Sequence, residues 1–416
     1  MAFKRVVVTG LGALTPIGNT VPEFWKGLKN GESGIDWITY FDTTKFKTRF
    51  ACEVKNFKVE DFMDRKEARK LDKYAQFALV TADEAIRDSG LDLEKIDLDL
   101  AGVIWSSGIG GIKTFEEEVG AYFKGDGTPR FSPFFIPKMI ADIAAGHISM
   151  KYNFRGPNFA AVSACASSSH AIIAAYQQIL LGKAIVMVAG GSESSITEAS
   201  IGGFNAMQAL STNNDEYKTA SRPFCKTRDG FVMGEGAAGM ILEEYEHAVA
   251  RGAKIYAEIV GTGLTADAYH LTAPHPEGLG AKKVMEMALK EANINPNNVD
   301  YINVHGTATP LGDIAELKAI QQVFGEHAYK LNISSTKSMH GHLLGGAGAI
   351  EAVASILAIV NDTIPPTINH KEVDENIDPN LNLTLHKAQE RTVRYAISNT
   401  FGFGGHNACI LFKKHE

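Results

Sequence analysis

The sequence has few cysteines, and none of them lie close together. Cys52, Cys165, Cys225 and Cys409 are scattered singly, and no Cys-X-X-Cys pair occurs. A structural zinc site or a disulfide framework needs clustered or regularly spaced cysteines. We therefore expect neither, and we expect the protein to occupy the reducing cytoplasm.

The sequence also lacks an excess of positive charge and a long apolar run. With 41 Lys and Arg against 48 Asp and Glu, the net charge is -7, whereas nucleic-acid binding needs a basic surface. The start, MAFKRVVVTGLG, has too short an apolar stretch for a signal peptide. No run approaches the roughly eighteen apolar residues that suggest a membrane span. We expect no nucleic-acid partner and no membrane insertion.

Fingerprints of nucleotide binding are absent as well. No Gly-X-X-X-X-Gly-Lys-Ser/Thr motif occurs, and no Gly-X-Gly-X-X-Gly follows the first predicted strand. The composition, 45% hydrophobic and 21% charged in 416 residues, is that of a soluble globular protein. This length suits two ordinary domains or one large duplicated one.

The chain repeats the same order of elements twice. Residues 4–12 (KRVVVTGLG) and 254–264 (KIYAEIVGTGL) each form a β-branched run that ends in a glycine turn, which predicts a strand. A helix, a polar linker and an apolar strand follow in both halves. Residues 158–181 and 331–359 then match as strand, polar turn and helix. The alternative is chance α/β periodicity, but the shared order favours a duplicated α/β protein with largely parallel sheets.

The repeat gives the domain boundaries. We expect an amino-terminal half at 1–253 and a carboxy-terminal half at 254–416. Residues 110–152 belong to neither repeat and include the Pro- and Phe-rich stretch TPRFSPFFIP. This segment is predicted to be an insertion that caps the site or meets a partner subunit.

Cys165 stands in the stretch AVSACASSSHAI, between a predicted strand and a predicted helix. Open α/β sheets bind ligands at the carboxyl ends of their strands. A helix amino terminus there would lower the pKa of a thiol and supply thiolate. The alternative is a packing residue, because free cysteine is among the most buried residue types.

Two histidines could serve such a nucleophile. His305 ends the predicted strand YINVH of the second half, and His342 opens a predicted helix. An imidazole kept neutral at a helix amino terminus donates an N–H to a developing oxyanion. Each could equally be an ordinary core histidine. His340 and His342 could also bind a metal, but no acidic or cysteine cluster accompanies them, and we expect no metal site.

Charged residues near these histidines form a further candidate group. Lys337 lies five residues before His342, and we expect it to face Glu351, Asp313 and Glu316 in a buried ion-pair network. An ordinary surface lysine is the alternative. The glycines of FGFGGHN (401–407) would permit tight turns beside a ligand.

A basic stripe begins at residue 64. In DRKEARKLDK, a helical pattern places five cations on one face: Arg65, Lys66, Arg69, Lys70 and Lys73. On an acidic protein this stripe is either a solvated face or a docking site for an acidic partner.

Several motifs together carry a family resemblance. They are the Cys165 turn, GFVMGEGAA (230–238), HGTATP (305–310), STKSMHGH (335–342) and FGFGGHN (401–407). Over essentially the whole chain the sequence resembles the elongating β-ketoacyl-acyl-carrier-protein synthases, with synthase II the most similar type. The resemblance implies a thiolase-like α/β fold with duplicated halves in five αβαβα layers, a homodimer, and no bound cofactor, because the substrates are thioesters on acyl carrier protein.

The resemblance also implies roles for residues. Cys165 takes up the acyl chain, and its N–H and that of Phe403 form an oxyanion hole. His305 and His342 stabilise the enolate left when malonyl carrier protein loses CO2. The remaining assignments are Lys337 with Glu351 for the electrostatics, Thr307 and Thr309 for the pantetheine arm, Phe403 as gate, Ile109 in the acyl pocket, and Lys66, Arg69 and Lys70 for carrier-protein docking.

Departures from the family pattern are local. His340 stands where the family commonly has threonine, and Ala308 where it commonly has serine. Alternatives within the superfamily are a synthase I-like or polyketide-type ketosynthase, a thiolase, or a chain-length factor without activity. Thiolases use a second cysteine near the chain's end, whereas Cys409 lies in the strand-like ACILF, and chain-length factors lack the active cysteine.

Overall fold

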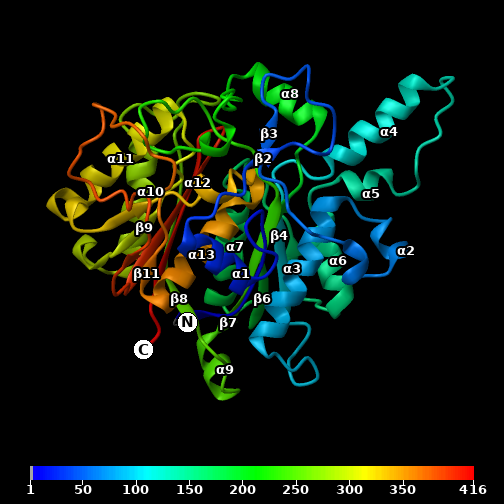
Figure 1. Ribbon diagram of the computed structural model, residues 1–416. Helices are drawn as coiled ribbons and strands as arrows, with labels where there is room; N and C mark the ends of the chain where they lie inside the picture. The colour runs from blue at the N-terminus through cyan, green and yellow to red at the C-terminus, as the bar shows by residue number, and fades with distance from the viewer. Residues whose placement is uncertain (1–2) are drawn as a thin grey trace.

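Ten strands form one sheet in the computed structural model, which describes residues 3–416 (Figure 1). Their order is β10-β9-β13-β14-β8-β1-β7-β6-β4-β5. The strands are β1 (Val6–Leu14), β4 (Ala101–Ser106), β5 (Asn158–Phe159), β6 (Val186–Glu193), β7 (Gly236–Glu244), β8 (Ala257–Ala266), β9 (Tyr301–Asn303), β10 (Asn332–Ser334), β13 (Tyr395–Gly402) and β14 (His406–Lys413). Two short pairs lie outside it, β2 (Asp36–Trp37) with β3 (Phe50–Ala51), and β11 (Thr363–Ile364) with β12 (Gln389–Glu390).

The two halves of the sheet have the same strand order. From the outer edge inward, one runs β5-β4-β6-β7-β1 and the other β10-β9-β13-β14-β8, and β1 pairs with β8 where they meet. This repeat confirms the predicted duplication. Each half is mixed rather than largely parallel, because β7 and β14 return antiparallel to their neighbours.

Glycines in the equivalent strands β1 and β8 show the duplication in helix packing as well. A Cβ on Gly12 of β1 would lie 2.1 Å from the carbonyl oxygen of Thr81 in α3 (Lys73–Ser89). A Cβ on Gly263 of β8 would lie 2.0 Å from that of Val284 in α10 (Leu279–Ala292). Both glycines lie inside their strands, so the glycine turns predicted at the strand ends were wrong. The missing side chains let a helix pack directly on each strand.

Helices cover both faces of each half and give five layers. α3 and α6 (Ile143–Tyr152) lie on one outer face, and α10 and α11 (Pro310–Phe324) on the other. α7 (Ser167–Leu180) and α13 (Ala347–Asn361) pack on each other between the two halves (Figure 1). The expected αβαβα arrangement is confirmed.

α13 is the most apolar helix of the core. The helical segment Leu344–Asn361, which contains α13, is long and apolar enough to cross a membrane, yet 89% of it is buried inside the molecule. The expectation that no run approaches this length was therefore wrong. Burial between the two halves explains the composition, since a helix covered on all sides needs no polar face.

The remaining helices lie around these layers. They are α1 (Val21–Asn30), α2 (Arg65–Ala68), α4 (Ile112–Lys124), α5 (Phe135–Met139), α8 (Glu198–Ala206), α9 (Tyr245–Ala250) and α12 (Lys337–His340), with 3-10 turns η1 (Val59–Asp61), η2 (Tyr217–Thr219), η3 (Pro296–Asn298), η4 (Gly325–Tyr329) and η5 (Leu344–Gly346). α4 and α5 lie in the predicted insertion 110–152 and project from the body of the molecule (Figure 1). α6, which the prediction also assigned to the insertion, packs instead on α3 and β4 in the outer layer, so the insertion is shorter than predicted.

Candidate active site

Cys165 lies on a tight turn between β5 and α7. The preceding Ala164 has a positive φ of 51°, and Cys165 is two residues before the first residue of α7. Gly402 packs against the turn, where a Cβ would lie 3.2 Å from the Cys165 nitrogen. The small residues on both sides thus allow a second backbone segment to approach the thiol, whose residue is only 7% exposed.

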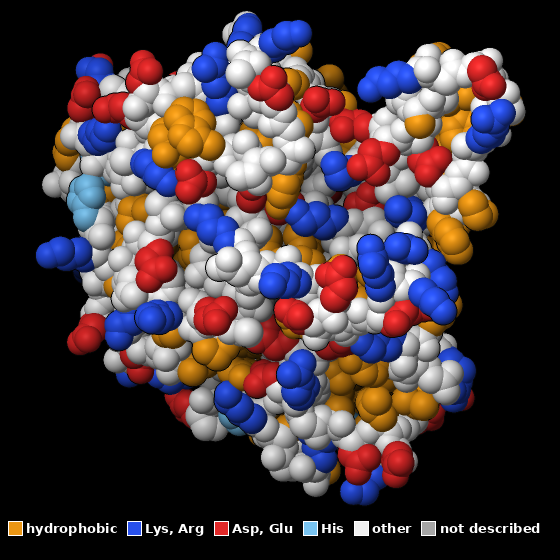
Figure 2. All heavy atoms as spheres, turned by 45° about the vertical axis from the view of Figure 1, so that its right-hand side comes forward, with side chains coloured by type: hydrophobic (Ala, Val, Ile, Leu, Met, Phe, Trp, Pro, Cys, Tyr) orange, Lys and Arg blue, Asp and Glu red, His pale blue; other side chains and the backbone are white. Residues whose placement is uncertain are grey.

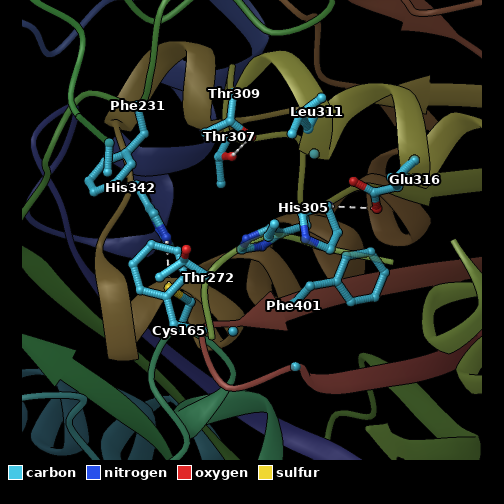
Figure 3. Close-up of a pocket in the computed structure, with 18 of the residues that line it drawn as sticks. Cys165, Phe231, Thr272, His305, Thr307, Thr309, Leu311, Glu316, His342 and Phe401 are labelled. Carbon is cyan, nitrogen blue, oxygen red and sulfur yellow. Dashed lines mark hydrogen bonds between the residues drawn. The ribbon is translucent and has the colours of Figure 1, made fainter. Parts of the chain in front are cut away.

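His342 contacts this thiol from the second half of the chain, and His305 lies beside His342 in the same cavity. His342 Nε2 lies 3.1 Å from Cys165 Sγ. The His305 and His342 rings are 5.4 Å apart at their centroids and nearly perpendicular. In Figure 3, His342 points at Cys165 and His305 points into the same space. The structure therefore brings together three residues that are far apart in the sequence.

Lys337 lies behind the two imidazoles. Its Nζ donates to the His305 carbonyl oxygen at 2.6 Å and forms a buried ion pair with Glu351 Oε1. Asp313 and Glu316, which we also expected to face Lys337, have other partners. Glu316 accepts from the N–H groups of His305 and Gly306, each at 2.9 Å.

A cavity of about 350 Å³ opens onto this group. Apolar side chains make up much of its wall, and Cys165, His305 and His342 lie at its inner end (Figure 3). Thr307 and Thr309 line it as well, with their hydroxyl oxygens 3.2 Å apart. Its shape and lining suit a substrate with an apolar part and a polar reacting group.

Both histidines are neutral at physiological pH. Burial lowers the pKa of His305 and of His342 well below the ordinary value, and the Lys337 charge lowers it further. The expected cause, a helix amino terminus, is minor, because His342 lies before η5 and five residues before α13. Neutral imidazoles can donate an N–H without adding positive charge to the site.

The thiol is protonated in the resting protein. Burial raises the pKa of Cys165 to about 12, although the Lys337 charge and the backbone N–H of Phe403 lower it in part. Burial therefore opposes the thiolate that the helix amino terminus was expected to favour. Cys165 and His342 form a neutral thiol–imidazole pair, and the proton must leave the sulfur as it attacks.

Comparison with known proteins agrees with this arrangement. The family model described as Beta-ketoacyl synthase, N-terminal domain, matches residues 3–248, and that of the C-terminal domain matches residues 256–371. The chain belongs to the β-ketoacyl synthase family. It is thus a condensing enzyme, a ketosynthase with a thiolase-like fold.

Its relatives cover the whole chain. It is 49% identical to 3-oxoacyl-[acyl-carrier-protein] synthase 2 of Synechocystis sp. over 415 residues, 99% of both chains. It is 49% identical to the protein of that name from Staphylococcus aureus (strain COL) over 413 residues, again 99% of both.

Solved ketosynthases have the same fold. A β-ketoacyl synthase from Burkholderia phymatum matches with a TM-score of 0.91 and 35% identity, over 99% of this chain and 100% of that one. A type II polyketide synthase acyl carrier protein in complex with its ketosynthase matches with a TM-score of 0.90 and 35% identity, over 100% of both chains.

The remaining predicted site residues of this ketosynthase differ in position. Phe403 lines the cavity next to Phe401. Ile109 is not part of the cavity wall, and its side chain is 39% exposed on the surface. A single chain therefore does not place Ile109 in the cavity that contains Cys165.

The basic stripe is not one helix. α2 ends at Ala68, and Asp72 then caps the separate helix α3 by accepting from the Tyr74 N–H. Lys73 turns inward to a buried ion pair with Glu235 at 2.9 Å. Lys66 and Arg69 remain exposed, and Lys70 is half-buried beside Glu67. Figure 2 shows Lys and Arg side chains gathered on this face, below the projecting arm.

The segment 231–235 holds His342, which the sequence did not show. The His342 N–H donates to the Val232 carbonyl at 2.7 Å, and its own carbonyl accepts from Gly234 at 2.9 Å. The Phe231 ring lies edge-on to the His342 ring, with centroids 5.1 Å apart. No local pattern in the motif GFVMGEGAA indicates that it contacts His342.

The loop 267–278 is a further part of the site that the sequence did not indicate. Asp267, Thr272 and His275 line the cavity. The Gly404 N–H donates to the Leu271 carbonyl at 2.7 Å, which ties this loop to the FGFGGHN turn. Nothing in the polar sequence of the loop distinguished it from an ordinary connection.

The metal-binding alternative for His340 and His342 finds no support in the geometry. His340 uses both ring nitrogens in hydrogen bonds, while His342 Nε2 faces Cys165. Across residues 3–416, no group of three or more His, Cys, Asp or Glu side chains is arranged to hold a metal ion.

Proposed function

We propose that this ketosynthase extends acyl chains in type II fatty-acid synthesis. It condenses malonyl-acyl carrier protein with an acyl group held on Cys165, and gives β-ketoacyl-acyl carrier protein and CO2. The observation that carries this proposal is that Cys165, His305 and His342 share the inner end of one cavity. The half 1–253 supplies the nucleophile, and the half 254–416 supplies both histidines.

The first stage transfers the acyl group. Cys165 Sγ attacks the thioester carbonyl, and its proton passes to His342 Nε2 across the 3.1 Å contact. The tetrahedral oxyanion accepts from the N–H groups of Cys165 and Phe403, both of which already favour negative charge on the sulfur. The pantetheine thiolate leaves and takes up a proton, while the His342 imidazolium releases its Nδ1 proton. The acyl group remains on Cys165, and His342 is again neutral with its proton on Nε2.

The second stage forms the carbon–carbon bond. Malonyl carrier protein loses CO2, and the enolate oxygen accepts from the N–H groups of neutral His305 and His342. The enolate carbon attacks the acyl carbonyl and displaces the Cys165 sulfur as a thiolate, which takes up a proton from solvent and restores the neutral thiol. Lys337, paired with Glu351, keeps both imidazoles neutral, while Thr307 and Thr309 hydrogen-bond the pantetheine arm and Phe403 gates the malonyl side.

The proposed condensation also implies the partners of this chain. The carrier protein is acidic, and it docks on Lys66, Arg69 and Lys70. A second copy of this chain completes the acyl pocket near Ile109. The thioesters supply all activated groups, so we propose that no bound cofactor is needed. The four cysteines are free, which supports a cytoplasmic protein.

A condensation assay tests the proposed function. Purified protein is incubated with acyl carrier protein loaded with a medium-length acyl group and with malonyl carrier protein, and the products are identified by mass spectrometry. We expect the β-ketoacyl product, with the rate reduced by about 10²- to 10⁴-fold in His305→Ala and in His342→Ala. Full activity in either variant would contradict the assigned roles.

A further inference from the structure

His340 is a buried titratable residue that the proposed chemistry does not use. It lies between Lys337 and His342 in the chain and is fully buried. It is not part of the cavity wall. Because His340 does not line the cavity, any role in the reaction has to act through a neighbouring residue.

Both ring nitrogens of His340 have partners. Nδ1 lies 2.8 Å from the Gly341 carbonyl oxygen, and Nε2 lies 3.0 Å from Thr336 Oγ1. A carbonyl oxygen can only accept, so Nδ1 carries the proton. Nε2 then accepts from the Thr336 hydroxyl, whose oxygen in turn accepts from Asn303 Nδ2 at 3.4 Å. The neutral ring thus links the two ends of α12, from Thr336 before the helix to Gly341 after it.

The Gly341 carbonyl belongs to the peptide that precedes His342. Gly341 has φ 73° and ψ -171°, and a Cβ there would lie 2.9 Å from Cys52 Sγ. The chain bends at this glycine, which sets the direction in which the His342 ring leaves the backbone. Glycine has little intrinsic preference of its own, so a bond to its carbonyl from outside the main chain restricts the bend.

The same turn carries Lys337. The Gly341 N–H donates to the Lys337 carbonyl at 3.0 Å, and the Ser221 hydroxyl donates to that carbonyl at 2.7 Å. Thr336, the other partner of His340, immediately precedes Lys337. One imidazole thus connects the residue before the lysine to the peptide before the histidine.

We propose that His340 is a positioning residue that fixes the α12 turn so that Lys337 lies behind the imidazoles and His342 Nε2 meets Cys165 Sγ. This inference rests on the proposed condensation, because it concerns the alignment of groups for that reaction. It assigns a task to a histidine that stands where the family commonly has threonine. Displacement of a reacting group by about 1 Å can cost about a hundredfold in rate.

Three variants test this role. His340→Leu fills the space without either hydrogen bond, His340→Gln restores a donor and an acceptor on one side chain, and Thr336→Val removes only the hydroxyl partner. His327→Leu is the matched control, because the His327 Nε2 also bonds a carbonyl oxygen, that of Val299 at 2.8 Å, outside the site. Each variant is compared with wild type for kcat, for KM of malonyl carrier protein, and for thermal unfolding.

We expect kcat to fall about ten- to a hundredfold in His340→Leu with KM within about twofold, and most of the loss to be recovered in His340→Gln. Thr336→Val should lose about threefold, and His327→Leu should keep the wild-type kcat. A folded His340→Leu with wild-type kcat overturns the inference. If that variant does not fold, a wild-type kcat in Thr336→Val overturns it. An inactive wild type would instead refute the proposed condensation.

Discussion

Lys337 acts together with burial on the protonation of the reacting side chains around it. Its ammonium is held by Glu351 and by the His305 carbonyl oxygen. From there it lowers the pKa of Cys165, His305 and His342. The sequence identified Lys337 and Glu351 as a pair. Asp313 and Glu316 form no ion pair with Lys337, although the Lys337 charge partly offsets the rise that burial causes in the pKa of both.

Removal of the Lys337 charge should change the pH dependence of condensation. A lowered imidazole pKa means that wild type keeps neutral histidines, and hence its activity, as the pH falls through 6.5. In Lys337→Met the pKa of both histidines rises, so the surviving activity should decline at a higher pH than in wild type. The measurement is kcat from pH 5.5 to 8, with Lys337→Arg as control. Profiles of identical shape would refute this account of Lys337.

His340 should make the stability of wild type depend on pH. Burial and the Lys337 charge lower the pKa of His340 to about 3, against an ordinary value of 6.5. Below pH 6.5 the unfolded chain binds a proton that the folded protein excludes, so stability falls as the pH falls. At pH 5 this cost is about 2 kcal/mol, from about 1.4 kcal/mol per pH unit.

Chemical denaturation of His340→Gln and wild type at pH 8 and pH 5 measures this effect. The difference in unfolding free energy should shift by about 2 kcal/mol in favour of the variant at pH 5. An unchanged difference would mean that His340 is not kept neutral by the fold.

At the scale of elements, α2 and α3 separate the cations that one helix was expected to carry. Asp72 begins α3 and also accepts from the Thr114 hydroxyl at 2.6 Å in the neighbouring insertion. Its capping role could have been read from the sequence, since aspartate is a preferred N-cap residue. The inward turn of Lys73 could not, because its partner Glu235 lies 162 residues away.

Charge reversal on the α2 segment should weaken carrier-protein binding. We expect the triple variant Lys66→Glu, Arg69→Glu and Lys70→Glu to bind acyl carrier protein at least tenfold more weakly at low salt, with the difference shrinking as salt is added. The control reverses Lys282, Lys283 and Lys290 on α10, which lies on the other side of the molecule (Figure 1). Equal binding by both variants would mean that Lys66, Arg69 and Lys70 are solvated surface residues and not a docking site.

Strand, turn and helix around Cys165 were predictable because the pattern is local. The clamp on His342 by residues 231–235 and the loop 267–278 were not predictable. They are defined by backbone hydrogen bonds between distant segments, which leave no period or spacing in the sequence.

At the scale of the whole molecule, one edge of the sheet and the arm beside it are exposed. β5 forms the outer edge, and Phe159 on it is 42% exposed. Further exposed aromatic and aliphatic side chains lie in the insertion, including Phe134, Ile136 and Phe123, the last of them 78% exposed. An open edge with apolar neighbours is a surface for strand pairing, which supports the proposed homodimer.

Sedimentation velocity tests the homodimer. Wild type should sediment at twice the mass of the chain, and Phe159→Glu should shift the equilibrium toward the single chain by placing a charge at the paired edge. Leu181→Glu, at an exposed site after α7, is the control and should remain dimeric. A wild type that sediments as a single chain at micromolar concentration would rule the homodimer out.

The central claim is that Cys165 carries the acyl group, and intact-mass spectrometry tests it most directly. The protein is incubated with acyl carrier protein bearing a medium-length acyl group, in the absence of malonyl carrier protein. We predict one acyl group per chain on wild type and on Cys225→Ala, and none on Cys165→Ala. An adduct of the same mass on Cys165→Ala, or its absence from wild type, would contradict the account.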